Sequence, residues 1–200
     1  MSDLSRLFMS ASRVSASMLR LLACAVLAVM SQAGAASAKP LFEKPVYNPE
    51  TKSYFELVPK READGTISTL EYWLWRDAEL EARQRVYKGV PGRLAIARTQ
   101  ETRQFLLYNF RTDVDTWFGL LYHCDARELV WPDGSTQGPD DFKVWAKKWD
   151  YSLGGCRSSN PKDRFLGIAF TPADRGFRWV AHGSNKGFHR YFVEYPTGEP

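Results

Sequence analysis

A strand rich in aromatic residues is predicted by the run Thr116-Trp117-Phe118-Gly119-Leu120-Leu121-Tyr122. Its hairpin partner is predicted at residues 128–131, ending at the turn Pro132-Asp133-Gly134. We expect Trp117, Phe118, Leu120 and Trp131 to enter the main core, together with Trp179. The hairpin is therefore predicted to belong to the main core of the domain.

Two helices are predicted upstream of this hairpin. The first covers residues 69–88, where apolar residues recur at the spacing of one helical face, namely Trp75, Ala78, Ala82 and Val86. The second starts after Thr99, a favourable cap, and runs to about Asn109. It should bury Phe105, Leu106 and Phe110.

Short strands are predicted on either side of these elements, at residues 52–58, 164–170, 177–181 and 188–195. Residues 135–163 form an irregular region with several Gly and Pro residues. Within it, Phe142, Trp145 and Trp149 stand at i, i+3 and i+7, which indicates a short helical turn. The pattern predicts a single α+β domain within the 200 residues.

The first 38 residues are typical of a signal peptide. Three Arg residues precede an apolar run at residues 21–30, and Ala36-Ser37-Ala38 resembles a cleavage site. We expect an extended lead-in at residues 39–51, a domain at 52–196 and a tail at 197–200. An uncleaved anchor is the alternative; after cleavage we expect no membrane association and a bacterial protein that is periplasmic or secreted.

The charge balance argues against nucleic acid as a partner. The chain has 27 basic and 23 acidic residues, and without the first 38 residues it has 24 and 22. No cluster of Lys and Arg of the kind that binds phosphate backbones remains.

Two cysteines remain after the signal segment, Cys124 and Cys156. In an oxidising compartment they would form one disulfide, which would stabilise the fold by roughly 3–4 kcal/mol. The alternatives are two free thiols or a catalytic pair of Cys124 with His123. The catalytic pair is disfavoured because adjacent strand residues point to opposite faces.

Four segments, taken together, resemble C-type lectin-like domains. Gly92-Arg93-Leu94-Ala95-Ile96 is similar to the approach to that family's second helix, and Trp117-Phe118-Gly119-Leu120 to its Trp-Ile-Gly-Leu strand. Trp131 with Asp133-Gly134-Ser135, and Trp179 with Phe192-Val193-Glu194-Tyr195, resemble its later motifs. The resemblance implies two helices packed on short antiparallel sheets, paired terminal strands and a long loop region.

The same resemblance implies that calcium does not bind at the family's sugar site. Gln137-Gly138-Pro139-Asp140 carries an inserted Gly, and Asn160-Pro161-Lys162 places a cation where a ligand is needed. The family's Trp-Asn-Asp triplet matches Trp179-Val180-Ala181, whose side chains offer no oxygen. We therefore predict no metal and no cofactor, although a structural calcium at Asp140 or Asp141 is the alternative.

The candidate ligand-binding residues lie in the long loop region: Trp145, Trp149, Tyr151, Asp140, Asp141 and Lys147. Aromatic rings stack on sugars or anchor protein interfaces. The alternative is that the two Trp residues form a small core beneath the loop and that Lys147 lies on a solvated face.

We expect an exported, non-catalytic recognition module that binds a carbohydrate or protein ligand without calcium. The sequence contains neither a G-x-S-x-G nor an H-E-x-x-H motif. No pair of carboxylates stands out as an acid and a base, so no catalytic motif indicates an enzyme. The alternatives are an envelope structural or assembly protein and, less favoured, a hydrolase on the same scaffold. The sequence does not indicate the oligomeric state.

Overall fold

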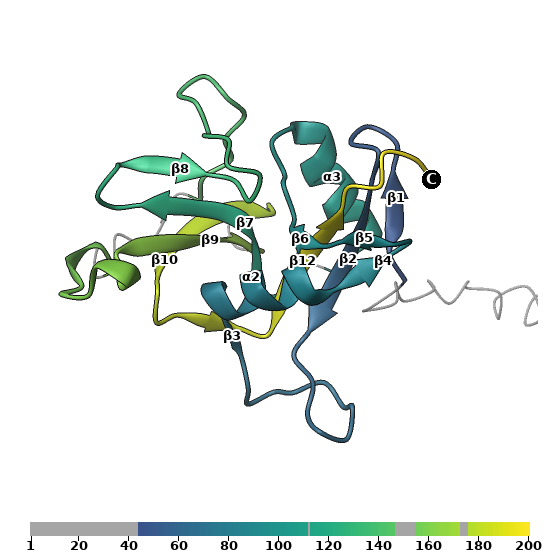
Figure 1. Cartoon of the computed structure of the whole chain (residues 1–200), viewed down its shortest axis with the longest axis horizontal. Helices are drawn as coiled ribbons and strands as arrows, with labels where there is room; N and C mark the ends of the chain where they lie inside the picture. The colour runs from purple at the N-terminus through teal and green to yellow at the C-terminus, as the bar shows by residue number, and fades with distance from the viewer. Residues whose placement is uncertain (1–43, 112, 147–154, 173–175) are drawn as a thin grey trace, which may run out of the picture. The chain divides into compact units, whose positions relative to one another are not determined.

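The computed structural model describes residues 44–111, 113–146, 155–172 and 176–200. Within this part of the chain, eight strands form one sheet. Six of them follow the order β1 (Val46–Asn48), β2 (Ser53–Pro59), β12 (Arg190–Tyr195), β7 (Thr116–His123), β9 (Phe165–Thr171) and β10 (Arg178–Gly183). β6 (Arg93–Leu94) pairs with β12, and β8 (Glu128–Val130) pairs with β7 (Figure 1).

The remaining elements are short. Among the described residues, the α-helices are α2 (Trp75–Gln84) and α3 (Gln100–Asn109), and η2 (Gly155–Arg157) and η3 (Pro161–Asp163) are single 3₁₀ turns. β3 (Trp73–Leu74) pairs with β11 (Gly187–Phe188), and β4 (Val86–Tyr87) pairs with β5 (Val90–Pro91). Neither helix has the length or the apolarity that a membrane span requires.

The two faces of the sheet carry separate hydrophobic clusters, because alternate strand residues point to opposite faces. In β12, Tyr191 and Val193 join the cluster covered by α2, whereas Phe192 joins the cluster that includes Leu106 of α3. The predicted pairing of N- and C-terminal strands is confirmed by the antiparallel ladder of β2 with β12. The residues of the predicted lead-in contribute β1.

The aromatic strand predicted at residues 116–122 is β7, and its first six residues are buried. Gly119 lies where no side chain fits, because a Cβ atom there would come within 2.5 Å of Pro132 and 2.8 Å of the Leu94 carbonyl oxygen. Its backbone N–H donates to Ala95 at 2.8 Å. The hairpin and the segment before α3 therefore meet closely at this glycine.

The first predicted helix is shorter than its apolar pattern suggests. Ser68 Oγ accepts hydrogen bonds from the backbone of Leu70 and Glu71, which holds a turn where the helix was expected to start. At the other end, Arg85 is already extended, and Val86 is 65% exposed in β4. The prediction of a helix over residues 69–88 was therefore wrong at both ends, while Trp75, Ala78 and Ala82 are buried as expected.

The second helix follows its prediction, and Thr99 caps it by accepting a hydrogen bond from the Thr102 backbone at 3.0 Å. Leu106 and Phe110 are buried, and Phe105 is partly buried. The strand predicted at residues 188–195 is divided instead. Phe188 pairs with Trp73, and the main-sheet strand β12 begins only at Arg190.

Candidate functional site

The long loop region, residues 132–164 between β8 and β9, is attached to the main sheet by a disulfide. Cys156 in η2 is bonded to Cys124, which directly follows β7, with 5.3 Å between their Cα atoms. The predicted disulfide is confirmed. It attaches the far part of the loop to the strand that also carries the hairpin.

The polar side chains in the first part of this loop pair with one another. Trp131 Nε1 donates to Gln137 Oε1 at 2.8 Å, and Gln137 Nε2 donates to the Phe142 carbonyl at 2.9 Å. The Gly138 backbone donates to Asp141 Oδ2 at 2.6 Å. These bonds give the described part of the loop a defined path.

The aromatic residues of the loop pack against Trp179 without forming a helical turn. Residues 142–146 are not helical, and Trp145 instead forms a parallel bridge with Trp179. Phe142 and Trp145 each place a ring edge-to-face with the Trp179 ring, at centroid distances of 5.9 and 5.5 Å. The predicted helical turn was therefore wrong over these residues. The i, i+3 spacing of Phe142 and Trp145 reflects their shared contact with Trp179 instead of a helical face.

The six predicted binding residues divide into two groups. Asp140 and Asp141 are exposed, and Trp145 is half-buried at the edge of the core. Lys147, Trp149 and Tyr151 lie outside the described residues. The structure thus places Asp140, Asp141 and Trp145 on one described stretch of the loop.

The positions at which the resemblance would require calcium ligands have other environments. Val180 and Ala181 are buried in β10 beside the fully buried Trp179. Asn160 caps η3 by accepting a hydrogen bond from the Lys162 backbone at 3.1 Å. Among the described residues, no three His, Cys, Asp or Glu side chains form a group that could hold a metal ion.

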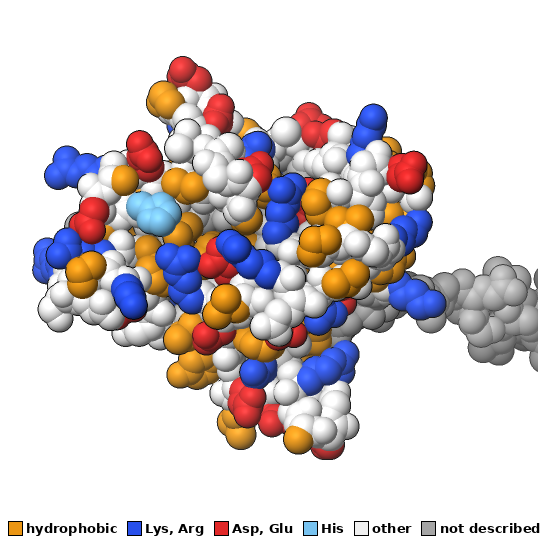
Figure 2. Space-filling model, in the orientation of Figure 1, with side chains coloured by type: hydrophobic (Ala, Val, Ile, Leu, Met, Phe, Trp, Pro, Cys, Tyr) orange, Lys and Arg blue, Asp and Glu red, His pale blue; other side chains and the backbone are white. Residues whose placement is uncertain are grey.

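The charges on the face seen in Figure 2 are mixed, with Lys and Arg side chains interspersed among Asp and Glu. Figure 2 shows no broad basic surface on this face. Ion pairs between neighbouring side chains occur on α2, where Arg76 and Arg83 both bind Glu79, at 3.0 and 2.8 Å.

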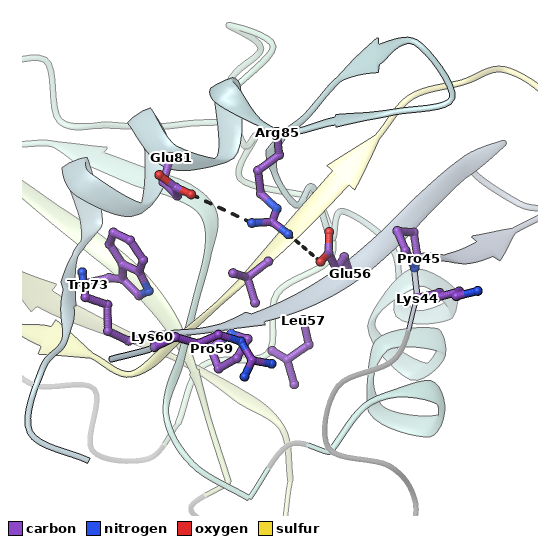
Figure 3. Close-up of a pocket in the computed structure, with 11 residues that line it drawn as sticks. Lys44, Pro45, Glu56, Leu57, Pro59, Lys60, Trp73, Glu81 and Arg85 are labelled. Carbon is purple, nitrogen blue, oxygen red and sulfur yellow. Dashed lines mark hydrogen bonds and ion pairs between the residues drawn. The ribbon is translucent and has the colours of Figure 1, made fainter. Parts of the chain in front are cut away.

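A pocket of about 560 Å³ lies between α2 and β2 (Figure 3), and we call it the α2–β2 pocket. It is lined by Lys44, Pro45, residues 56–61, Trp73, Glu81 and Arg85. A second hollow of about 540 Å³ shares Pro45, Glu56, Glu81 and Arg85 with it. Glu56, Glu81 and Arg85, the charged residues of this shared set, therefore line both cavities.

Arg85 is the centre of the charged network. Its Nη2 donates to Glu56 Oε1 at 2.7 Å, its Nε donates to the Tyr195 hydroxyl at 3.3 Å, and its Nη1 lies 3.9 Å from Glu81 Oε1. The Tyr195 hydroxyl in turn donates to Glu56 Oε2 at 2.5 Å. Both carboxylate oxygens of Glu56 are therefore occupied.

Burial and hydrogen bonding shift the pKa values of this network. Burial disfavours the charged form of Arg85, but the Tyr195 hydroxyl and the Glu56 carboxylate outweigh it and raise the pKa of the guanidinium. Burial, with the hydrogen bond to Glu56, raises the pKa of Tyr195 to about 12. Arg85 is therefore charged and Tyr195 neutral at physiological pH.

Two buried hydrogen-bonding atoms beside this network have no partner among the described residues: Trp73 Nε1 and the Tyr191 hydroxyl. The Trp73 and Tyr191 rings meet edge-to-face with centroids 5.5 Å apart, and Tyr191 has no exposed surface. Burial and the charges of Glu81 and Glu56 raise the pKa of Tyr191, whereas the charge of Arg85 and a minor hydrogen bond to it oppose this shift. The Tyr191 hydroxyl therefore lies near the ion network.

The sequence analysis missed this pocket, although one signal was present. Glu56 interrupts the apolar run of β2, whose residues on either side are buried. A carboxylate in the middle of a buried strand requires a cationic or hydrogen-bonding partner. That partner is Arg85, which is 29 residues away and was placed inside the predicted helix.

Comparisons with known proteins identify the fold. The C-type lectin CEL-I from Cucumaria echinata aligns with a TM-score of 0.51 and 13% identity, covering 79% of this chain and 96% of that one. Human lithostathine aligns with a TM-score of 0.51 and 16% identity, covering 78% and 96%. No protein-family model and no curated protein matches the sequence. The chain has the C-type lectin-like α+β fold, which confirms the resemblance drawn from its motifs.

Proposed function

We propose that this chain is an exported, non-catalytic recognition module that binds a carbohydrate or protein ligand through its long loop region without calcium. The observation that carries the proposal is the attachment of this loop. The Cys124–Cys156 bond and the hydrogen bonds of Gln137 hold it to the sheet, while Asp140 and Asp141 remain exposed on it. Binding residues are commonly placed on loops that a rigid scaffold positions.

Calcium independence is supported by the donor set. Ca²⁺ requires 6–8 oxygen ligands, and buried Val180 and Ala181 supply no side-chain oxygen. Asn160 uses its side-chain oxygen to cap η3. Binding would therefore depend on hydrogen bonds and ring contacts made by the protein itself.

Export is supported by the signal-like pattern of residues 1–38 and by the disulfide, because disulfides persist in oxidising compartments. A non-catalytic role is supported by the fold, since CEL-I is named as a lectin. The ligand itself is a proposal for this chain, because the likeness concerns fold alone.

A glycan array probed with the purified protein, with and without a chelator, tests this proposal. We expect binding that the chelator leaves unchanged and that Trp149→Ala or Tyr151→Ala weakens. Tyr108→Ala is the matched control, because Tyr108 is a 71% exposed aromatic residue on α3. Loss of binding with chelator would overturn calcium independence, and equal binding by all three variants would overturn the long-loop location.

A further inference from the structure

The α2–β2 pocket has more hydrogen-bond donors than the protein itself uses. The Trp73 indole N–H can only donate, and it is buried without a partner within the described residues. In Figure 3 the indole nitrogen lies on the side of the ring nearer the middle of the pocket. Leaving such a donor unpaired is unfavourable, so an acceptor at this place would be stabilised.

Two cations, Lys60 and Arg85, line the same space. Lys60 Nζ lies 3.8 Å from the centroid of the Trp73 ring, and its ion pair with Glu71, at 3.6 Å, lies at the surface. Arg85 Nη1 is 3.9 Å from Glu81, too far for a strong hydrogen bond.

The acceptors of the pocket are mostly occupied. Glu56 receives hydrogen bonds from Arg85 and Tyr195 on its two oxygens. Glu81 is the other carboxylate of the lining, and its side chain is 37% exposed. Against these two carboxylates the lining has four cations: Lys44, Lys60, Arg61 and Arg85. An acceptor with negative charge therefore fits the pocket better than a neutral or cationic group.

We infer that the α2–β2 pocket binds the carboxylate of a small organic acid, either free or as the uronic acid unit of an acidic saccharide. The carboxylate accepts from the Trp73 N–H, and the long, flexible Lys60 side chain brings its ammonium group to the same anion. The apolar body of the ligand packs against Val58, which lines the pocket. This site is separate from the long loop region, so it does not depend on the function proposed for that loop.

Titrations of the ¹⁵N-labelled full chain, followed through the Trp indole N–H signals, test the inference. The Trp73 signal is the one that Trp73→Phe removes. We expect it to move saturably with glucuronate and to stay in place with glucose, which has the same ring without the carboxylate. Acetate and benzoate form the second arm: a shift with these acids identifies a free acid, whereas a saturable shift with glucuronate alone identifies the acidic saccharide. A stationary signal in both arms, or an equal response to glucose, overturns the inference.

Variants separate recognition from structure. Lys60→Gln should weaken the probe by roughly three- to fivefold, because a cation that lines the pocket is removed. Glu81→Gln should strengthen it by roughly two- to threefold, because a repelling carboxylate is removed. Trp149→Ala should leave probe binding unchanged, so failure of this site and failure of the long-loop proposal are distinguishable. Unchanged affinity in both Lys60→Gln and Glu81→Gln contradicts the pocket as the binding place.

Discussion

The indole of Trp131, at the start of the long loop region, and the indole of Trp73, in the α2–β2 pocket, differ in their hydrogen bonding. The Trp131 N–H donates to Gln137, and the Gln137 amide donates to a backbone carbonyl. The Trp73 N–H is buried without a partner among the described residues. The first indole thus helps to fix the path of a loop, whereas the second leaves a donor beside a cavity for a ligand.

The largest expected effect is at Trp179, the ring on which the loop packs. It is fully buried and contacts the rings of Phe118, Trp131 and Trp145. Trp179→Ala should lower the free energy of unfolding by roughly 3–5 kcal/mol, because it leaves a large cavity. Urea denaturation followed by circular dichroism measures this. A loss under about 1 kcal/mol would show that the loop aromatics do not depend on this ring.

Removing the disulfide tests whether the loop is held covalently or by packing. Cys124→Ser with Cys156→Ser opens a connection of 32 residues and should cost roughly 3–4 kcal/mol in the chain-entropy description. Urea denaturation of the double variant gives the value. The Trp73 indole N–H signal should stay in place, because the pocket lies on other elements. A shift of that signal would contradict the independence of the two regions.

Tyr195→Phe examines a paired hydroxyl at the border of the pocket. This hydroxyl donates to Glu56 and accepts from Arg85, so its loss leaves two charged groups less well bonded. The expected cost is about 1–2 kcal/mol in the free energy of unfolding. An unchanged free energy of unfolding would mean that water takes the place of the Tyr195 hydroxyl between Glu56 and Arg85.

Local patterns in the sequence were sufficient to predict the helices, the hairpin and the fold resemblance. The cap at Thr99, the face of Trp75, Ala78 and Ala82, and the strand from Thr116 each follow from nearby residues. The pocket was not predictable in this way, because Glu56, Trp73 and Arg85 come from separate segments that only the folded chain brings together. α2 ends at Gln84, and the next residue, Arg85, binds Glu56, a long-range contact that helical periodicity does not contain.

Acid should weaken the turn that begins the long loop region. Burial opposes ionisation of Asp133, but hydrogen bonds from Ser135 and the guanidinium of Arg98 outweigh it and lower the pKa of the carboxyl group. A lowered pKa stabilises the fold above the unfolded value of 3.8, and this contribution is lost as the pH falls through the folded value. Asp133→Asn should therefore reduce the fall in stability below pH about 5, by less than about 1 kcal/mol because the pair is partly exposed. Unfolding curves at several pH values compare the variant with the parent. An identical pH dependence of the two free energies of unfolding would exclude the Asp133 carboxylate as a cause of the loss of stability in acid.

The smallest expected effect is also the most specific. Tyr191 and Tyr195 lie on the same strand, and Tyr191→Phe, like Tyr195→Phe, removes one phenolic oxygen. In the described chain the Tyr191 hydroxyl has no partner at full hydrogen-bond geometry and only a minor interaction of this kind with Arg85, so its removal costs little. The free energy of unfolding should change by less than about 0.5 kcal/mol or rise. Parallel urea titrations of Tyr191→Phe and Tyr195→Phe give the difference directly. If Tyr191→Phe costs as much as Tyr195→Phe, the Tyr191 hydroxyl is a full member of the hydrogen-bonded network around Arg85.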